Sequence, residues 1–186
     1  MDIVNWNKLS QQAFQHAYKN GLTGNHEFSF DLMMIITELG EAVNADKKGK
    51  SADRVMFERN FDTPQVNPEK HWVFCYETFI KDTLEDELAD AFIAMLTFSE
   101  QWNEPINTFL YNETFMSRAI NLMKRKKHFP VQIHAIVSLL INRGELDLAA
   151  LRLIGLCSHL QIDLLWHIEQ KMKYNEMRPF KHGKKY

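Results

Sequence analysis

Two stretches of sequence decide the fold: LMMIITELGEAV at residues 32–43 and LEDELADAFIAML at residues 84–96. Both are apolar at helical spacing, and each carries two acids three positions apart, Glu38 with Glu41 and Glu87 with Asp90. Side chains at positions i and i+3 lie about 60° apart around a helix axis, so each pair shares one face. If the two helices are neighbours, four carboxylates converge on one spot.

The remainder of the chain also follows a helical period, and it contains no convincing alternating strand pattern. We therefore expect an all-α protein, a helical bundle in which the two acidic helices are paired. The whole chain, residues 1–186, is expected to form a single domain, with residues 51–76 as an inserted loop that holds only a short helix at 52–59. Two prolines and several turn formers favour that loop. The other helices are expected at residues 4–19, 29–46, 77–102, 113–127, 131–141, 145–160 and 163–175.

Composition limits the classes of function. With 186 residues, of which 45% are hydrophobic, the chain can bury a core. A net charge of −2 gives no general attraction for nucleic acid or anionic membranes, and the basic run at residues 124–128 is expected to be a solvated helix end. Cys75 and Cys157 have no metal-ligand or C-x-x-C spacing. Without a signal-like start or a spanning apolar run, we expect a cytoplasmic protein with no membrane partner.

Carboxylates that border an apolar stripe are costly to desolvate unless a cation compensates them. Clusters of oxygen ligands suit hard cations, so the four acids Glu38, Glu41, Glu87 and Asp90 are candidate ligands for Mg²⁺, or for Mn²⁺. A di-iron site of the bundle type needs Glu-x-x-His, and none of the eight histidines lies three residues after a glutamate. The ordinary alternative, acids that border solvent and pair with lysines, stays open.

The order of these motifs resembles that of a known family. ELGE at residues 38–41 followed by ELAD at residues 87–90 resembles the E-x-x-E…E-x-x-D signature of the MazG-like, all-α nucleoside triphosphate pyrophosphohydrolases. The segment KMKYNEMRP at residues 171–179 is similar to the K-x-x-x-N-x-x-R-P ending of that family. The resemblance covers less than half of the chain, roughly residues 30–49, 77–100 and 163–186.

Carried over to this chain, the resemblance implies that the four acids bind Mg²⁺ and that Lys171, Asn175 and Arg178 contact the phosphates or sugar of a nucleotide. Lysine and arginine suit phosphate oxygens, as a compact charge and as a planar fork respectively. Two departures affect the expectation. Family members often place two adjacent acids at the start of the first motif, where this chain has Thr37, and the stretch between the acid pairs is unusually long.

The resemblance implies a reaction that converts a (d)NTP and water to a (d)NMP and pyrophosphate. Glu38 is our candidate for the base that activates the water, and Lys171 and Arg178 are expected to share the developing negative charge. Phe28 and Phe30 are candidates for stacking on the base, although core packing is the more common use of such residues. A homodimer or homotetramer is expected, since relatives assemble in this way.

Two alternatives remain open. One is a different pyrophosphate substrate on the same scaffold, of the dUTP or phosphoribosyl-ATP type. The other is a non-catalytic helical protein that binds nucleotides or acts as an adaptor. Nucleic acid is not expected as a partner.

Overall fold

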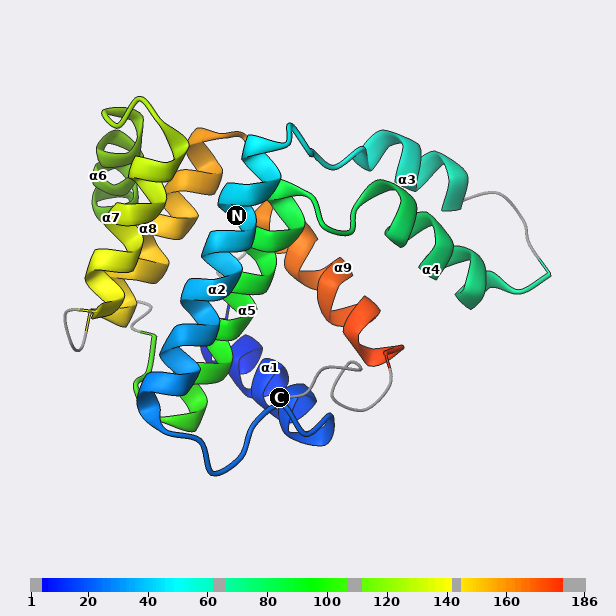
Figure 1. Ribbon diagram of the computed structural model, residues 1–186, viewed down its shortest axis with the longest axis horizontal. Helices are drawn as coiled ribbons and strands as arrows, with labels where there is room; N and C mark the ends of the chain where they lie inside the picture. The colour runs from blue at the N-terminus through cyan, green and yellow to red at the C-terminus, as the bar shows by residue number, and fades with distance from the viewer. Residues whose placement is uncertain (1–4, 62–65, 107–111, 142–144, 179–186) are drawn as a thin grey trace.

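The computed structural model describes residues 5–61, 66–106, 112–141 and 145–178 (Figure 1). All regular secondary structure in these ranges is helical, which confirms the predicted all-α class. The described helices are α1 Trp6–Lys19, α2 Phe28–Lys47, α3 Arg54–Phe61, α4 Pro68–Phe79, α5 Leu84–Gln101, α6 Glu113–Lys124, α7 Phe129–Ile141, α8 Leu146–His159 and α9 Leu164–Glu176.

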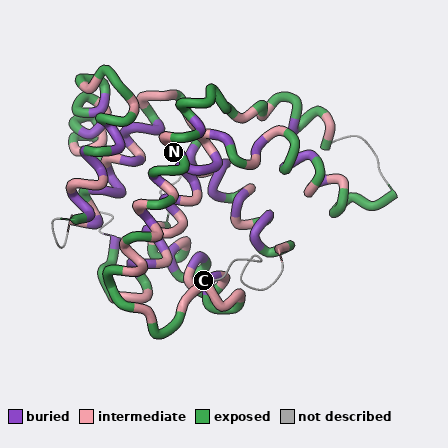
Figure 2. Tube along the Cα trace, in the orientation of Figure 1, coloured by how far each residue is buried: buried purple, intermediate pink, exposed green. Residues whose placement is uncertain are grey.

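Helix α5 is the centre of the bundle. It packs against α1, α2, α8 and α9, and ten of its 18 residues are buried. The main core consists of its apolar side chains with those of α2, α7 and α8, and Figure 2 shows how the buried positions gather on the facing sides of these helices. The two acidic helices, α2 and α5, are direct neighbours, as the sequence predicted.

The predicted loop at residues 51–76 is wrong from Pro68 onward, whereas the short helix expected at 52–59 is present as α3. Most of this segment forms α3 and α4, which pack against each other and extend from one side of the bundle (Figure 1). Their aromatic residues make a second core with α9, in which Phe57, Trp72, Tyr76 and Tyr174 are buried. The error comes from proline, which by sequence alone indicates a loop. Pro68 instead directly follows the N-cap Asn67 in the first turn of α4, where a helix needs no N–H from that residue.

The predicted helix at residues 77–102 is in fact two helices. Helix α4 ends at Phe79 and α5 begins at Leu84, with Asp82 between them at φ 59°. Thr83 is the N-cap of α5, and its Oγ1 accepts a hydrogen bond from the N–H of Asp86. The break turns the chain so that α4 faces α9 while α5 enters the core.

One glycine sets how closely α8 approaches α6. A Cβ added at Gly155 would lie 2.8 Å from the Cβ of Ala119 and 2.9 Å from its carbonyl carbon. We expect Gly155→Ala to lower the free energy of unfolding by about 1–3 kcal/mol, because the overpacking outweighs the gain in helix propensity. Urea denaturation measures the effect.

Gly40 in the middle of α2 is the matched control. A Cβ added there meets no atom within 4 Å, so Gly40→Ala is expected to raise the free energy of unfolding by roughly 0.5–1 kcal/mol. If Gly155→Ala were as stabilising as Gly40→Ala, the close contact between α6 and α8 would not exist in solution.

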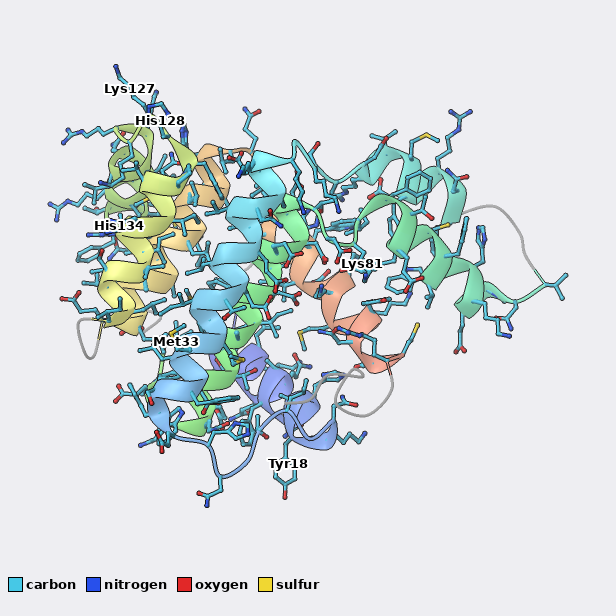
Figure 3. All side chains as sticks on the ribbon, viewed as in Figure 1. Tyr18, Met33, Lys81, Lys127, His128 and His134 are labelled. Atoms are coloured by element: carbon cyan, nitrogen blue, oxygen red, sulfur yellow. The ribbon has the colours of Figure 1, made fainter. Side chains whose placement is uncertain are left out.

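Several labelled side chains project from the ends of the molecule into solvent. Figure 3 shows Lys127 and His128 projecting from the end where α6 meets α7, while Tyr18 projects from the opposite end, on α1. The basic run at residues 124–128 is mostly exposed, as expected of a solvated helix end. Among the described residues, no individual helix has the length and apolarity to cross a bilayer; α8 and α9 meet those criteria only as a pair, and they are bent by 108° at their junction.

Candidate metal centre and cavity

The acid pair on α2 faces α5. Ile35, Leu39 and Ala42 are buried on one side of α2, and they anchor it against the core. Glu38 is half-buried and Glu41 is exposed, so the pair lies at the edge of the buried stripe. The turn of α2 that carries both acids is therefore fixed by the packing of its apolar side.

Three of the four predicted metal ligands come together. Carboxylate oxygens of Glu38, Glu41 and Glu87 all lie within 4.8 Å of one another. Oxygen ligands on opposite sides of a Mg²⁺ ion are about 4 Å apart, so this group fits the ion after small side-chain adjustments. The carboxylates are hard oxygen donors, and no histidine or cysteine of the described part of the chain belongs to the group, which favours Mg²⁺ or Mn²⁺ over softer metals.

Glu87 is the electrostatic centre of the group. It is 6% exposed, and burial together with the charge of Asp90 raises its pKa to about 8, against an ordinary value of 4.5. The nearby charge of Lys171 lowers the pKa but does not cancel these effects. A divalent cation bound beside Glu87 would stabilise its ionised form against these effects.

Asp90, the fourth predicted ligand, lies outside this group of three. Its Oδ2 is 2.6 Å from the Nζ of Lys171, and the same Nζ donates to Oδ2 of Asp86 at 2.9 Å. The contact of Lys171 with phosphate stays a prediction, and the contacts that the structure describes for its ammonium group are with these two carboxylates. Lys171 is 4% exposed and bridges two carboxylates, so it can act on a ligand through Asp90 rather than by touching it.

Asp86 is the residue that sequence reasoning missed. It is 1% exposed and accepts hydrogen bonds from the hydroxyl of Tyr76, the backbone N–H of Asp82 and Lys171. Burial alone would lower the pKa of Lys171, but the charges and hydrogen bonds of Asp90 and Asp86 raise it above its usual range. The sequence contained one signal, the pattern TLED at residues 83–86, which is typical of a helix start.

A cavity of about 310 Å³ adjoins the acid group. It lies between α1, α2 and α5 and reaches the end of α9. Its lining includes Glu38 and Asp90 from the acidic helices, Asn175 from α9 and Arg178, which follows the C-cap of α9. The predicted ligands Asn175 and Arg178 thus share one space with two of the predicted acids, while the tail beyond Arg178 lies outside the described residues.

The prediction that Phe28 or Phe30 stacks on the base of a nucleotide needs one correction. Phe28 does not line this cavity, since its ring packs edge-on against Phe98 at 4.9 Å and Trp102 at 5.2 Å between ring centroids. Phe30, two positions along α2, lines it instead.

No family model matches the chain, and no match was found among curated proteins or among solved structures.

Proposed function

We propose that this protein is a Mg²⁺-dependent nucleotide pyrophosphohydrolase that converts a (d)NTP and water to a (d)NMP and pyrophosphate. The observation that carries the proposal is the shared cavity: Glu38 and Asp90 line it together with Asn175 and Arg178. One acid of the proposed cation group, Glu38, and donors for phosphate oxygens thus line the same space. The resemblance of both acid motifs and of the C-terminal segment to MazG-like enzymes supports the same chemistry.

Mg²⁺ held by Glu38, Glu41 and Glu87 would neutralise the phosphates and lower the pKa of a bound water. Arg178 is placed to bind phosphate oxygens with its planar fork, and Asn175 can donate its amide N–H to the same group. The half-buried Glu38 is our candidate to take the proton of the attacking water. Lys171 keeps Asp90 oriented at the cavity wall, which makes it a positioning residue in this scheme.

Pyrophosphate release from a panel of (d)NTPs, with Mg²⁺ and with EDTA, tests the proposal. We expect metal-dependent release, and we expect Glu38→Gln to lower kcat by about 10²–10⁴-fold because it removes the base. Nucleotide binding should largely persist, since Glu41 and Glu87 remain to hold Mg²⁺ and glutamine keeps a neutral oxygen ligand at position 38.

Glu69→Gln is the matched control, because Glu69 is an exposed acid on α4. Its turnover should equal that of the wild type. Absence of pyrophosphate release from every nucleotide, by protein that is folded and binds Mg²⁺, would contradict the proposal and favour a non-catalytic nucleotide-binding role. Full activity of Glu38→Gln would contradict only the role of Glu38.

A further inference from the structure

The cavity has a second polar end. Asp31 lies in the first turn of α2, seven residues before Glu38, which places it roughly 10 Å away along the helix. Gln101, the last residue of α5, lines the same end, as does Thr23 from the segment between α1 and α2. A sugar and an α-phosphate span about this length, so this end is where the base of a bound nucleotide would lie.

Asp31 fixes the orientation of the Gln101 amide. The Nε2 of Gln101 donates to Oδ2 of Asp31 at 2.7 Å and to the carbonyl oxygen of Gly24 at 3.5 Å. A carboxylate and a carbonyl can only accept, so the amide cannot turn around. Both N–H groups of Gln101 are used, and Oε1 is the atom that it can offer to a ligand.

Asp31 itself is held by three donors. Besides Gln101, the indole N–H of Trp102 donates to Oδ2 at 3.0 Å, and Nδ1 of His26 donates to Oδ1 at 3.1 Å. A carboxylate has about four acceptor directions, so one remains, on Oδ1. The side chain of Asp31 is 14% exposed, which leaves this oxygen little access to bulk water.

Thr23 adds a hydroxyl group that can donate a hydrogen bond, whereas Gln101 and Asp31 offer acceptors. Its Oγ1 is buried and has no hydrogen-bond partner among the described residues, although buried polar atoms are normally paired. A threonine hydroxyl can donate to a ring nitrogen that carries a lone pair. Phe30 lines the same space with an aromatic ring on which a base can stack.

We propose that Asp31, Gln101 and Thr23 select nucleotides whose base carries an amino group at position 4 of a pyrimidine or position 6 of a purine, beside an unprotonated ring nitrogen, that is, cytosine or adenine. The amino group donates one N–H to Gln101 and the other to Asp31, and the ring nitrogen accepts from Thr23. A keto base would place its carbonyl oxygen against two acceptors and leave them unpaired, which sites of this kind reject strongly. This inference rests on the proposed function, because it assigns the base end of the same site.

Matched pairs of nucleotides test the inference. Cytosine has a 4-amino group beside an unprotonated N3, whereas uracil has a 4-keto group beside a protonated N3. Adenine and hypoxanthine differ in the same way at position 6 and N1. Calorimetric titration of the full chain with dCMP, dUMP, dAMP and dIMP measures base preference without hydrolysis. We expect the amino member of each pair to bind at least about tenfold more tightly, a difference of about 1.4 kcal/mol.

Two variants change the recognition in different directions. Asp31→Asn keeps an oxygen for Gln101 and Trp102 but replaces the acceptor Oδ1 with a donor, so the preference should move toward dUMP and dIMP. Gln101→Met removes the acceptor Oε1 but keeps a side chain of similar length. The affinities for the amino and keto members of each pair should therefore become nearly equal. Asp46→Asn, an exposed acid at the other end of α2, is the control and should leave both ratios unchanged.

The outcomes separate this inference from the proposed function. Equal binding of amino and keto nucleotides by the wild type, or an unchanged ratio in Asp31→Asn, would overturn the inference even if pyrophosphate release is rapid. A preference for the amino bases in a protein that releases no pyrophosphate would support the inference and contradict the enzyme. Failure of all four monophosphates to bind would overturn the base-binding end itself.

Discussion

Replacing Lys171 with methionine is expected to lower the free energy of unfolding by about 3–5 kcal/mol. The ammonium group of Lys171 lies 2.9 Å from Asp86 and 2.6 Å from Asp90, in a place where Lys171 and Asp86 have almost no solvent contact. Methionine fills a similar volume but leaves two neighbouring carboxylates without their cation. Breaking a buried ion pair from one side costs far more than the pair contributes when intact.

Lys81→Met is the control for this prediction. Lys81 forms an ion pair with Asp82 at 3.2 Å, and both side chains are about a third or more exposed, so its loss should cost about 0–1 kcal/mol. Urea denaturation of both variants gives the comparison. Adding Asp86→Asn to Lys171→Met removes one orphaned charge and should recover part of the stability. If Lys171→Met were no more destabilising than Lys81→Met, the buried bridge would be wrong.

The local parts of the fold follow from the sequence because their causes are local. Apolar spacing predicts α2, and the acid pair on it can be read from an i, i+3 spacing alone. Gly49, at φ 65°, occupies the position after the C-cap of α2, where glycine is the residue that most easily adopts a positive φ. The errors at residues 51–83 have two causes: Pro68 begins a helix where a loop was expected, and Thr83 caps a new helix where a continuous one was expected.

The polar partners in the site are harder to predict, because they come from distant parts of the chain. Lys171 meets Asp86 across 85 positions, and Gln101 meets Asp31 across 70. Helical periodicity gives the face of a helix on which a residue lies, but the partner depends on which helices become neighbours. The four acids could therefore be predicted as a set, whereas the separation of Asp90 from the other three could not.

Glu87→Gln should make the metal-free protein more stable at neutral pH. The folded-state pKa of Glu87, about 8, lies above its ordinary value of 4.5, so the group favours folding most below pH 4.5. That contribution is lost progressively as the pH rises from 4.5 to 8, and the loss at pH 7 is about 3 kcal/mol. Glutamine does not ionise, but it leaves a buried amide to be paired, so we expect a net gain of about 2 kcal/mol.

The pH dependence and the response to Mg²⁺ distinguish this cause from a general packing effect. In EDTA, the unfolding free energy of the wild type should fall between pH 5 and pH 8 relative to that of Glu87→Gln, and at pH 4.5 the wild type should be slightly more stable than the variant, because its protonated Glu87 replaces the buried amide. Added Mg²⁺ should stabilise the wild type and not the variant, because a cation that binds the folded state compensates the ionised Glu87. Glu100→Gln changes an exposed acid on the same helix and should follow the wild type throughout. Parallel pH profiles for the wild type and Glu87→Gln would show that Glu87 is not held in a strained, buried state, and the case for a cation at this position would lose its electrostatic basis.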